Sequence, residues 1–335
     1  MTPTRTARLL AVAGSRLGRA LLALLVVAGT LAGWWLTSGG TASYPKGVAG
    51  FATGVPTGVY DKYGQFLRSY VRGTMPGVEL RLDGSEGSVD NLERVGSGRD
   101  DFAIATADAV ADYAGPGKGQ LRAIARLYDD YLQLVVPAGS PVRRVADLGG
   151  LRVGVGQPKS GVTLVTHELL KAAGIDPDTG IRAVPVGVAD AAELLRTGRL
   201  DAFFWSGGLP TGALTDLSDR FPIKIVPLGD MVDALHQESG GAGAYRAAVL
   251  PSGAYPRMPS TNTPVLTMAV PNLLVTRADV DPRLVEGLTA AVIDSRDTIG
   301  LQVHAAQVVD LRTAVYTDPL PLHEGARRYY RSVKP

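Results

Sequence analysis

The stretch LRVGVGQPKSGVTLVTHELLKAAG, residues 151–174, contains the pattern that decides the fold. Leu151–Val155 is mostly apolar and predicts a buried strand. A loop of glycine, serine and lysine follows, and apolar residues then recur at helical spacing from Gly161 until Gly174 ends the helix. A strand that passes through a Gly-rich loop into a helix is the repeating unit of parallel α/β sheets.

The same unit recurs along the chain. Apolar runs predict strands over 48–53, 78–82, 102–105, 121–127, 132–136, 184–186, 201–205, 223–227 and 265–275. Apolar residues at helical spacing predict helices over 59–73, 89–95, 189–196 and 282–299. Strands that alternate with helices predict an α/β fold with mostly parallel sheets. The length of 335 residues suits two domains.

The charge distribution separates a leader from the body. The first 40 residues carry four arginines and no acid, and Ala20–Leu36 is uncharged and ends in two tryptophans. A signal anchor and a signal peptide both fit this segment, and we expect 1–43 to comprise a cytoplasmic tail, this segment and a linker. The remaining body has 30 basic and 32 acidic residues. It therefore lacks the basic surface typical of a nucleic-acid-binding protein.

Three predicted strand–helix junctions are rich in glycine and hydroxyl residues. They are TGVPTGVY (53–60), GSEGSV (84–89) and GQPKSGVT (156–163). Each places free backbone N–H groups at a helix start, where they attract anions. The hydroxyls of Thr53, Thr57 and Ser85, and the glycine at Gly161, are candidate ligand contacts. Plain helix capping without a ligand is the alternative for each junction.

A fourth cluster, DAFFWSGGLP (201–210), ends a buried strand in aromatic residues and a turn. Trp205 and Ser206 are candidates to form a wall of a pocket. Packing in the core is the alternative for Trp205, and Tyr128 at the end of another predicted strand leaves the same two alternatives.

Several catalytic and metal-binding motifs are incomplete. The loop 156–163 has Val162 where a P-loop requires lysine, and Ser85 lacks the frame of a nucleophile elbow. The four histidines show no metal-site spacing, and the chain has no cysteine. We therefore expect no enzyme activity, no catalytic residue, no metal and no cofactor.

The motifs, in their order along the chain, resemble the TAXI-type solute receptors, the binding proteins of TRAP transporters. The matching residues are Thr53, Gly54, Gly58 and Tyr60; Gly87, Ser88 and Asn91; Leu127 and Tyr128; Asp147, Leu148, Gly150, Val153 and Gly156; Ser160, Gly161 and Thr163; 201–210; and His323, Gly325, Ala326, Tyr329 and Tyr330. The resemblance covers about residues 48–331.

The resemblance implies a two-lobed, periplasmic-binding-protein-like (type II) fold with a hinge. It implies an acidic small ligand, glutamate or glutamine in some members, and an integral membrane transporter subunit as partner. By position it also implies a set of ligand-binding residues: Thr53, Tyr60, Ser88, Asn91, Tyr128, Ser160, Thr163 and Trp205.

The apolar runs 132–136 and after Thr263 flank the second strand–helix block. We therefore expect lobe 1 to comprise 44–137 with 268–335, and lobe 2 to comprise 138–267. The favoured function is capture of a carboxylate-bearing solute on the extracytoplasmic side of the membrane, with delivery to a transporter. A membrane-tethered sensor and an enzyme with this fold are the alternatives. Because Lys159 is the only cation in the three junctions, we expect backbone N–H groups and hydroxyls to hold the carboxylate.

Overall fold

The computed structural model describes residues 20, 23–24, 26–30, 44–56, 58–237, 241–301, 307 and 309–333. The chain divides into two compact units, Met1–Tyr44 and Pro45–Pro335. The described residues between 20 and 30 are helical, and most of the predicted apolar segment Ala20–Leu36 lies outside the described residues. Within the described part of the chain, no helix has the length and apolar character needed to span a bilayer.

The second unit contains a single curled sheet. Its strands are β1 Gly47–Ala52, β2 Val78–Asp83, β3 Phe102–Thr106, β4 Leu121–Pro137, β5 Arg152–Gly154, β6 Arg182–Val184, β7 Ala202–Gly207, β8 Ile223–Val226, β9 Arg246–Leu250 and β10 Val265–Arg277. The strand order is β2-β1-β3-β10-β4-β7-β5-β6, with β8 beside β4 and β9 beside β10.

Helices connect most of these strands. The α-helices are α3 Val59–Thr74, α4 Ser88–Ser97, α5 Ala107–Asp112, α6 Gly161–Ala172, α7 Val188–Arg196, α8 Gly212–Arg220, α9 Val232–Leu235, α10 Pro282–Asp294, α11 Arg296–Gly300 and α12 Glu324–Val333. Short 3-10 turns are η1 Lys118–Gln120, η2 Val145–Leu148, η3 Gly229–Met231, η4 Gly241–Ala244 and η5 Pro259–Thr261.

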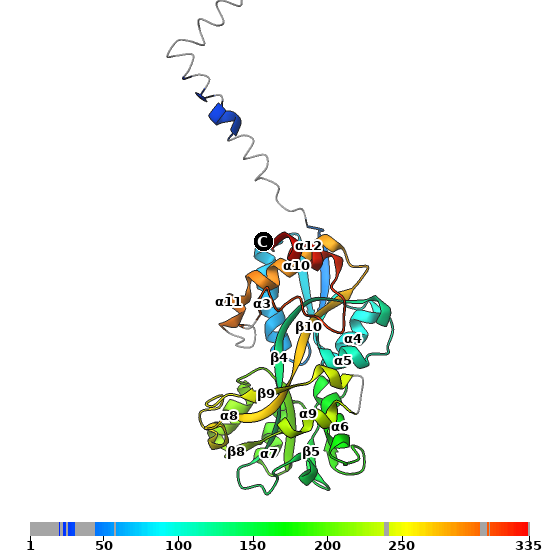
Figure 1. Ribbon diagram of the computed structural model, residues 1–335, viewed down its shortest axis with the longest axis vertical. Helices are drawn as coiled ribbons and strands as arrows, with labels where there is room; N and C mark the ends of the chain where they lie inside the picture. The colour runs from blue at the N-terminus through cyan, green and yellow to red at the C-terminus, as the bar shows by residue number, and fades with distance from the viewer. Residues whose placement is uncertain are drawn as a thin grey trace, which may run out of the picture. The chain divides into compact units, whose positions relative to one another are not determined.

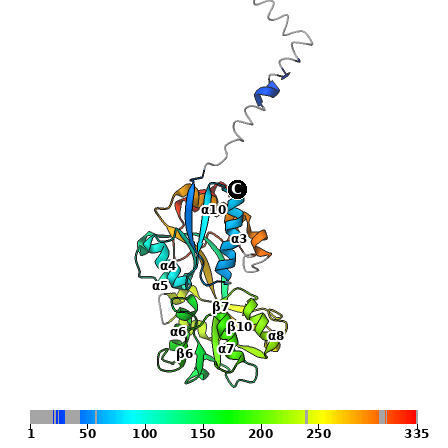
Figure 2. The same cartoon turned by 180° about the vertical axis from the view of Figure 1, so that it is seen from behind.

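Two long strands, β4 and β10, join two lobes (Figures 1 and 2). The first lobe contains the parallel strands β1–β3 with α3–α5 and α10–α12, and the second contains β5–β9 with α6–α9. Residues 121–131 of β4 pair with β10, whereas residues 131–137 pair with β7 and β8. The expected two-lobed, type II binding-protein-like α/β fold is therefore present. The expectation of a mostly parallel sheet is wrong, because parallel pairing among the described strands is confined to β1–β3 and β5–β7, whereas the long strands β4 and β10 pair antiparallel with each other and with their neighbours.

The crossing strands differ from the prediction in one respect. The sequence predicts separate strands over 121–127 and 132–136, but the structure has one continuous strand, Leu121–Pro137. The charged pair Asp129–Asp130 interrupts the apolar pattern, but both residues still pair with β10, beside the bulge between Pro271 and Leu273. A polar residue inside a strand is tolerated where its side chain faces a site instead of the core.

The C-terminal part of the chain also differs in detail. The predicted helix 282–299 is two helices, α10 and α11, because the buried residue Ser295 ends the first with φ −82° and ψ −3°. Strand β9 and helix α12 did not follow from the sequence pattern. Helix α12 packs on α10 of the first lobe, so the C-terminal segment returns to the lobe that the N-terminal strands form.

Candidate functional site

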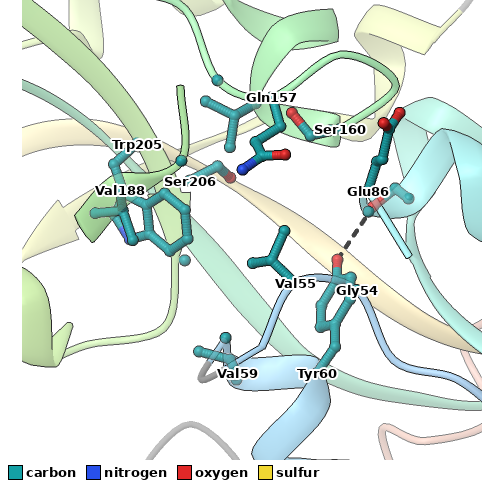
Figure 3. A pocket seen from close by; sticks show the side chains of 18 of the residues that line it. Gly54, Val55, Val59, Tyr60, Glu86, Gln157, Ser160, Val188, Trp205 and Ser206 are labelled. Carbon is teal, nitrogen blue, oxygen red and sulfur yellow. Dashed lines mark hydrogen bonds between the residues drawn. The ribbon is translucent and has the colours of Figure 1, made fainter. Parts of the chain in front are cut away.

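A cavity of about 90 Å³ lies between the two lobes. Residues from both lobes face one another across it, among them Tyr60 and Val59 on one side and Trp205 and Val188 on the other (Figure 3). The described lining comprises residues 53–55, 58–60, 86–88 and 106 of the first lobe, Asp130 of β4, and residues 156–157, 160–162, 186–188 and 204–207 of the second lobe.

Four helices of at least nine residues begin at this cavity. Two are in the first lobe, α3 and α4, and two are in the second, α6 and α7. Gly58 and Gly187 are the N-cap residues of α3 and α7, and no described side chain caps either helix. Their first N–H groups therefore have no intrahelical acceptor, and the helix dipoles add a partial positive charge.

The starts of α4 and α6 are occupied by protein groups. The carbonyl oxygen of Lys159 accepts hydrogen bonds from the backbone amides of Val89 (3.0 Å) and Asp90 (3.3 Å). The Ser160 hydroxyl accepts from the amide of Thr163 at 3.2 Å and so caps α6. The two helix starts that remain for a ligand are therefore those of α3 and α7.

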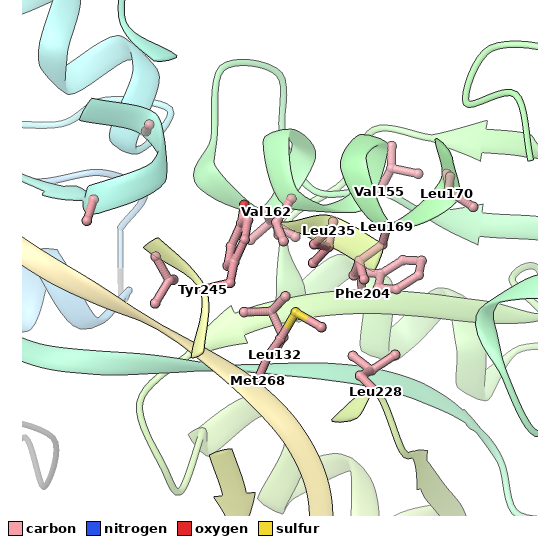
Figure 4. Close-up of a cluster of buried hydrophobic side chains, with 14 of the residues drawn as sticks. Leu132, Val155, Val162, Leu169, Leu170, Phe204, Leu228, Leu235, Tyr245 and Met268 are labelled. Atoms are coloured by element: carbon pink, nitrogen blue, oxygen red, sulfur yellow. The ribbon is translucent and has the colours of Figure 1, made fainter. Parts of the chain in front are cut away.

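The core of the second lobe holds α6 in place. Val162, Leu169 and Leu170 point from this helix into a buried cluster with Phe204 and Tyr245 (Figure 4). Each such side chain contributes about 1.5–3 kcal/mol when fully buried. The loop 156–160 is therefore presented to the cavity by a helix that packing fixes.

A directional chain of hydrogen bonds forms one wall of the cavity. The amide of Thr106 donates to Ser88 Oγ at 3.2 Å, and the tyrosine hydroxyl of Tyr60 lies 3.2 Å from the same oxygen (Figure 3). Tyr60 donates its own proton to Asn272 Oδ1 at 2.5 Å. Ser88 is therefore the donor to Tyr60, because a tyrosine hydroxyl has one proton to donate.

A bulge in β10 accompanies this arrangement. The register between β10 and β4 shifts between Pro271 and Leu273, so Asn272 has no partner on β4 and pairs with Thr106 of β3. Proline lacks the N–H that a regular ladder needs, and a bulge changes the direction of neighbouring side chains. Asn272 is completely buried, and its Nδ2 has no hydrogen-bond partner among the described residues.

Asp130 is the buried charged residue of the cavity. Its side chain belongs to the middle of β4, and its Oδ1 has no hydrogen-bond partner within the described residues. Burial raises the pKa of Asp130 to about 7, the nearby Asn272 amide lowers this pKa, and Asp108 raises it. A neighbouring positive charge would return the carboxyl to its ionised form.

The charged residues that line the described cavity are both acidic. They are Asp130 and the exposed Glu86, whose backbone amide is held by Asp90. Lys159 does not line the cavity, and its ammonium pairs with Glu93 of α4 at 2.7 Å. The cavity therefore offers partial positive charge at its helix starts and negative charge at its two carboxylates.

Comparison with known proteins places this arrangement in a family. A model described as the NMT1-like family matches residues 51–333, which include both lobes. The chain belongs to the NMT1-like family.

Three solved structures are similar to this NMT1-like chain. PhnD1 from Prochlorococcus marinus (MIT 9301), in complex with methylphosphonate, has a TM-score of 0.50 and 12% identity, covering 76% of this chain and 88% of its own. A putative L-cystine ABC transporter from Listeria monocytogenes has a TM-score of 0.49 and 16% identity, over 78% and 98% of the two chains. The periplasmic aliphatic sulphonate binding protein SsuA from Escherichia coli has a TM-score of 0.47 and 14% identity, over 87% and 84%. The likeness to PhnD1 agrees with the two-lobed fold.

Most of the residues that the sequence selects in the NMT1-like chain lie at the cavity. These are Thr53, Tyr60, Ser88, Ser160, Gly161, Trp205 and Ser206. Trp205 also donates from Nε1 to Thr211 Oγ1 at 2.9 Å, which fixes its ring. Thr57 lies outside the described residues. The role of these selected residues in ligand binding stays a prediction.

Four selected residues lie around this cavity without lining it. Asn91 is buried and donates to the carbonyl of Ile104, and Tyr128 is buried against Tyr63. Thr163 donates to the carbonyl of Gln157 at 2.5 Å and belongs to the cap of α6. Ser85 lines a second hollow of about 620 Å³, which shares seven described residues with the cavity. Asn91, Tyr128 and Thr163 therefore lie next to residues of the cavity wall, and Ser85 lies in the hollow beside the cavity.

The sequence analysis did not select Asp130, Asn272 or Thr106. A carboxylate in the middle of an otherwise apolar run, LYDDYLQLVV, is the signal that could have indicated Asp130. Asn272 follows a proline inside a long strand, which is typical of a bulge. The sequence around Thr106 contains no signal that distinguishes a ligand-contacting threonine from one that only caps a helix.

Proposed function

We propose that this chain is an extracytoplasmic receptor that captures a small polar, carboxylate-bearing solute of the glutamate or glutamine type by closure of its lobes. The cavity between two lobes, with four helix starts at its walls, is the observation that carries this proposal. Concave sites between lobes that combine apolar walls with a few fixed polar groups are typical of small-molecule binding.

The ligand carboxylate is held by backbone N–H groups at the starts of α3, at Val59 and Tyr60, and of α7, which approach it from opposite lobes. A hydrogen bond to a charged group contributes about 1.5–3 kcal/mol, and a helix terminus about 0.3–2 kcal/mol. Two or three such contacts, less the cost of ordering the ligand and the lobes, agree with a micromolar Kd, about −8 kcal/mol.

In this proposal, lobe 1 comprises residues 44–137 and 268–335, and lobe 2 comprises residues 138–267. Closure brings residues of the two lobes into contact. Two sets of contacts between described residues join the lobes. The carbonyl and the ammonium of Lys159 in lobe 2 contact α4 of lobe 1, and the hydroxyl of Tyr245 in lobe 2 donates to Asp108 of lobe 1 at 2.5 Å. Strands β4 and β10 are the hinge, because they are the long strands that continue from lobe to lobe. A ligand that contacts both sides stabilises the closed form by its differential affinity.

The motifs of the TAXI-type receptors support delivery to a TRAP-type membrane transporter. The arginine-flanked apolar segment Ala20–Leu36 supports export and a tether at the outer face of the membrane. The same tether favours a second candidate, a sensor that reports closure to a signalling partner. Reconstitution of the chain with TRAP membrane subunits in proteoliposomes distinguishes the two. Ligand uptake that depends on this chain supports the receptor, and binding without stimulated uptake supports the sensor.

Ligand binding is tested by thermal shift of the full chain against the twenty amino acids and small carboxylates. A ligand at 100 times its Kd adds about 2.7 kcal/mol of stability, which raises Tm by several degrees. We expect a rise with at least one carboxylate-bearing compound and 1:1 stoichiometry in calorimetry. A flat response over the whole set contradicts the proposal.

A further inference from the structure

We infer that the ligand carries an ammonium group in addition to its carboxylate, and that Asp130 is the counter-ion of this group. The inference rests on the proposed function, whose glutamate- or glutamine-type solute has such an ammonium group, and adds the residue that recognises it. Asp130 lines the cavity from β4, one of the two strands common to both lobes.

The position of Asp130 calls for a partner. Its side chain is 5% exposed, and Oδ1 has no hydrogen-bond partner among the described groups. The nearby Asn272 amide lowers the pKa of this carboxyl, but its Nδ2 is not in hydrogen-bond geometry with it, and a buried carboxylate is unfavourable unless a cation or donor meets it. Burial is the main cause that raises the pKa of this carboxyl to about 7.

Two further acceptors line the same cavity without a partner in the described structure. They are Ser206 Oγ and Thr106 Oγ1, both buried. Thr106 lies beside Asp108 and lowers the pKa of that carboxyl, although the two are not in hydrogen-bond geometry. An ammonium group has three donors, so it matches a carboxylate and two hydroxyls better than a ligand hydroxyl with one donor does.

Charge balance gives the same result. The charged lining residues in the described cavity, Asp130 and Glu86, are acidic, whereas the helix starts of α3 and α7 attract an anion. A dicarboxylate without an ammonium group would meet the helix starts favourably but would leave Asp130 unpaired or repel it. A zwitterion satisfies both kinds of group at once.

The test compares amino acids with the same acids lacking the amine. Thermal shift on the full chain uses the twenty amino acids and their deaminated partners, for example L-glutamate with glutarate and L-glutamine with glutaramate. Calorimetry then measures Kd for the responding pairs. We expect each deaminated acid to bind at least about 10-fold more weakly, the lower range for a hydrogen bond to a charged group.

Variants assign the preference to a residue. Asp130→Asn should reduce the discrimination between amino acid and deaminated acid to about 3-fold or less. Asp100→Asn is the matched control, because Asp100 is 1% exposed, has a raised pKa from burial, and does not line the cavity. If Asp130→Asn does not fold, Ser206→Ala replaces it, with weaker amino-acid binding and unchanged binding of the deaminated acid.

Each outcome decides the inference. Deaminated acids that bind as tightly as amino acids overturn it and leave a carboxylate receptor standing. An undiminished preference in Asp130→Asn, or in Ser206→Ala where it replaces Asp130→Asn, overturns the assignment of the ammonium group to these lining residues. No binding in either set overturns the inference and the proposed function together.

Discussion

Tyr60 donates a 2.5 Å hydrogen bond to the side-chain oxygen of Asn272, a residue 212 positions later in the chain. Tyr60 lies in the first turn of α3, and Asn272 lies at the bulge of β10. The bond therefore ties a helix start at the cavity to one of the two strands that join the lobes. Burial raises the pKa of Tyr60, so the hydroxyl stays protonated and keeps its role as a donor.

Tyr60→Phe should lower both stability and affinity. It leaves the oxygen of Asn272 without its donor, and an unsatisfied buried group costs about 1–3 kcal/mol. Urea unfolding and calorimetry with the amino acid selected by thermal shift measure the two effects. Tyr70→Phe on the same helix is the control, since Tyr70 does not line the cavity. Equal stability of Tyr60→Phe and wild type would show that the bond contributes nothing.

Alanine variants of Ser160 and Thr163 should distinguish a contribution to ligand affinity from a contribution to the stability of α6. Ser160 caps α6 and lines the cavity, whereas Thr163 donates from its hydroxyl to the carbonyl of Gln157 and does not line the cavity. Thr163→Ala removes the hydrogen bond to Gln157 and is expected to lower the free energy of unfolding by about 1 kcal/mol with Kd unchanged. Ser160→Ala is expected to lower stability similarly and also to weaken binding. Denaturant unfolding and calorimetry on both variants measure this, and an unchanged Kd for Ser160→Ala would restrict that residue to capping.

The pH dependence of stability should report the burial of Asp130. Its pKa is about 7 in the folded protein and about 3.9 in an unfolded chain. Between these values the folded state keeps a proton that the unfolded state has lost, so this group makes stability fall as pH rises towards 7. The groups near the carboxyl are Asn272, which lowers its pKa, Asp108, which raises it, and the tyrosines Tyr60 and Tyr128.

Asp130→Asn should remove this part of the pH profile. Relative to wild type, the variant is expected to gain stability from pH 5 to pH 8 in urea unfolding without ligand. Because Asp108 and Asp100 also have raised pKa values, the difference between the two proteins, and not the wild-type profile alone, is the measurement. A difference that does not change with pH would mean that the Asp130 carboxyl is ionised normally.

Much of the architecture was predictable because its signals are local. The strand–loop–helix unit at 151–174 became β5 and α6, with Ser160 as the N-cap and the helix beginning at Gly161. The first two junctions follow the parallel strands β1 and β2 and so lie at one edge of the sheet in the first lobe, whereas β5 runs in the opposite direction and brings the third junction to the same cavity from the second lobe.

What could not be predicted depends on contacts between distant segments. Asp130 lines the cavity, and Asn272 contacts Tyr60 without lining it. The bulge at Pro271 sets their register, and register is not visible in composition. Lys159 is the cation of its junction, but its ammonium turns to Glu93, 66 residues earlier. Asn91 and Tyr128 match family positions, yet their side chains are buried beside the cavity. Sequence order alone cannot distinguish a lining residue from its support.

The central claim is that ligand binds between the lobes as they close, and Gly161 tests it most directly. A Cβ at Gly161 would lie 3.1 Å from Thr106 Oγ1 and 3.2 Å from Ser88 Oγ, both across the lobe interface. Calorimetry with the amino acid selected by thermal shift compares wild type, Gly161→Val and the control Gly149→Val, where a Cβ meets nothing within 4 Å. We expect 1:1 binding in wild type and control, and at least about a 100-fold loss in Gly161→Val with an unchanged circular dichroism spectrum. Wild-type affinity in a folded Gly161→Val would contradict binding at this cavity.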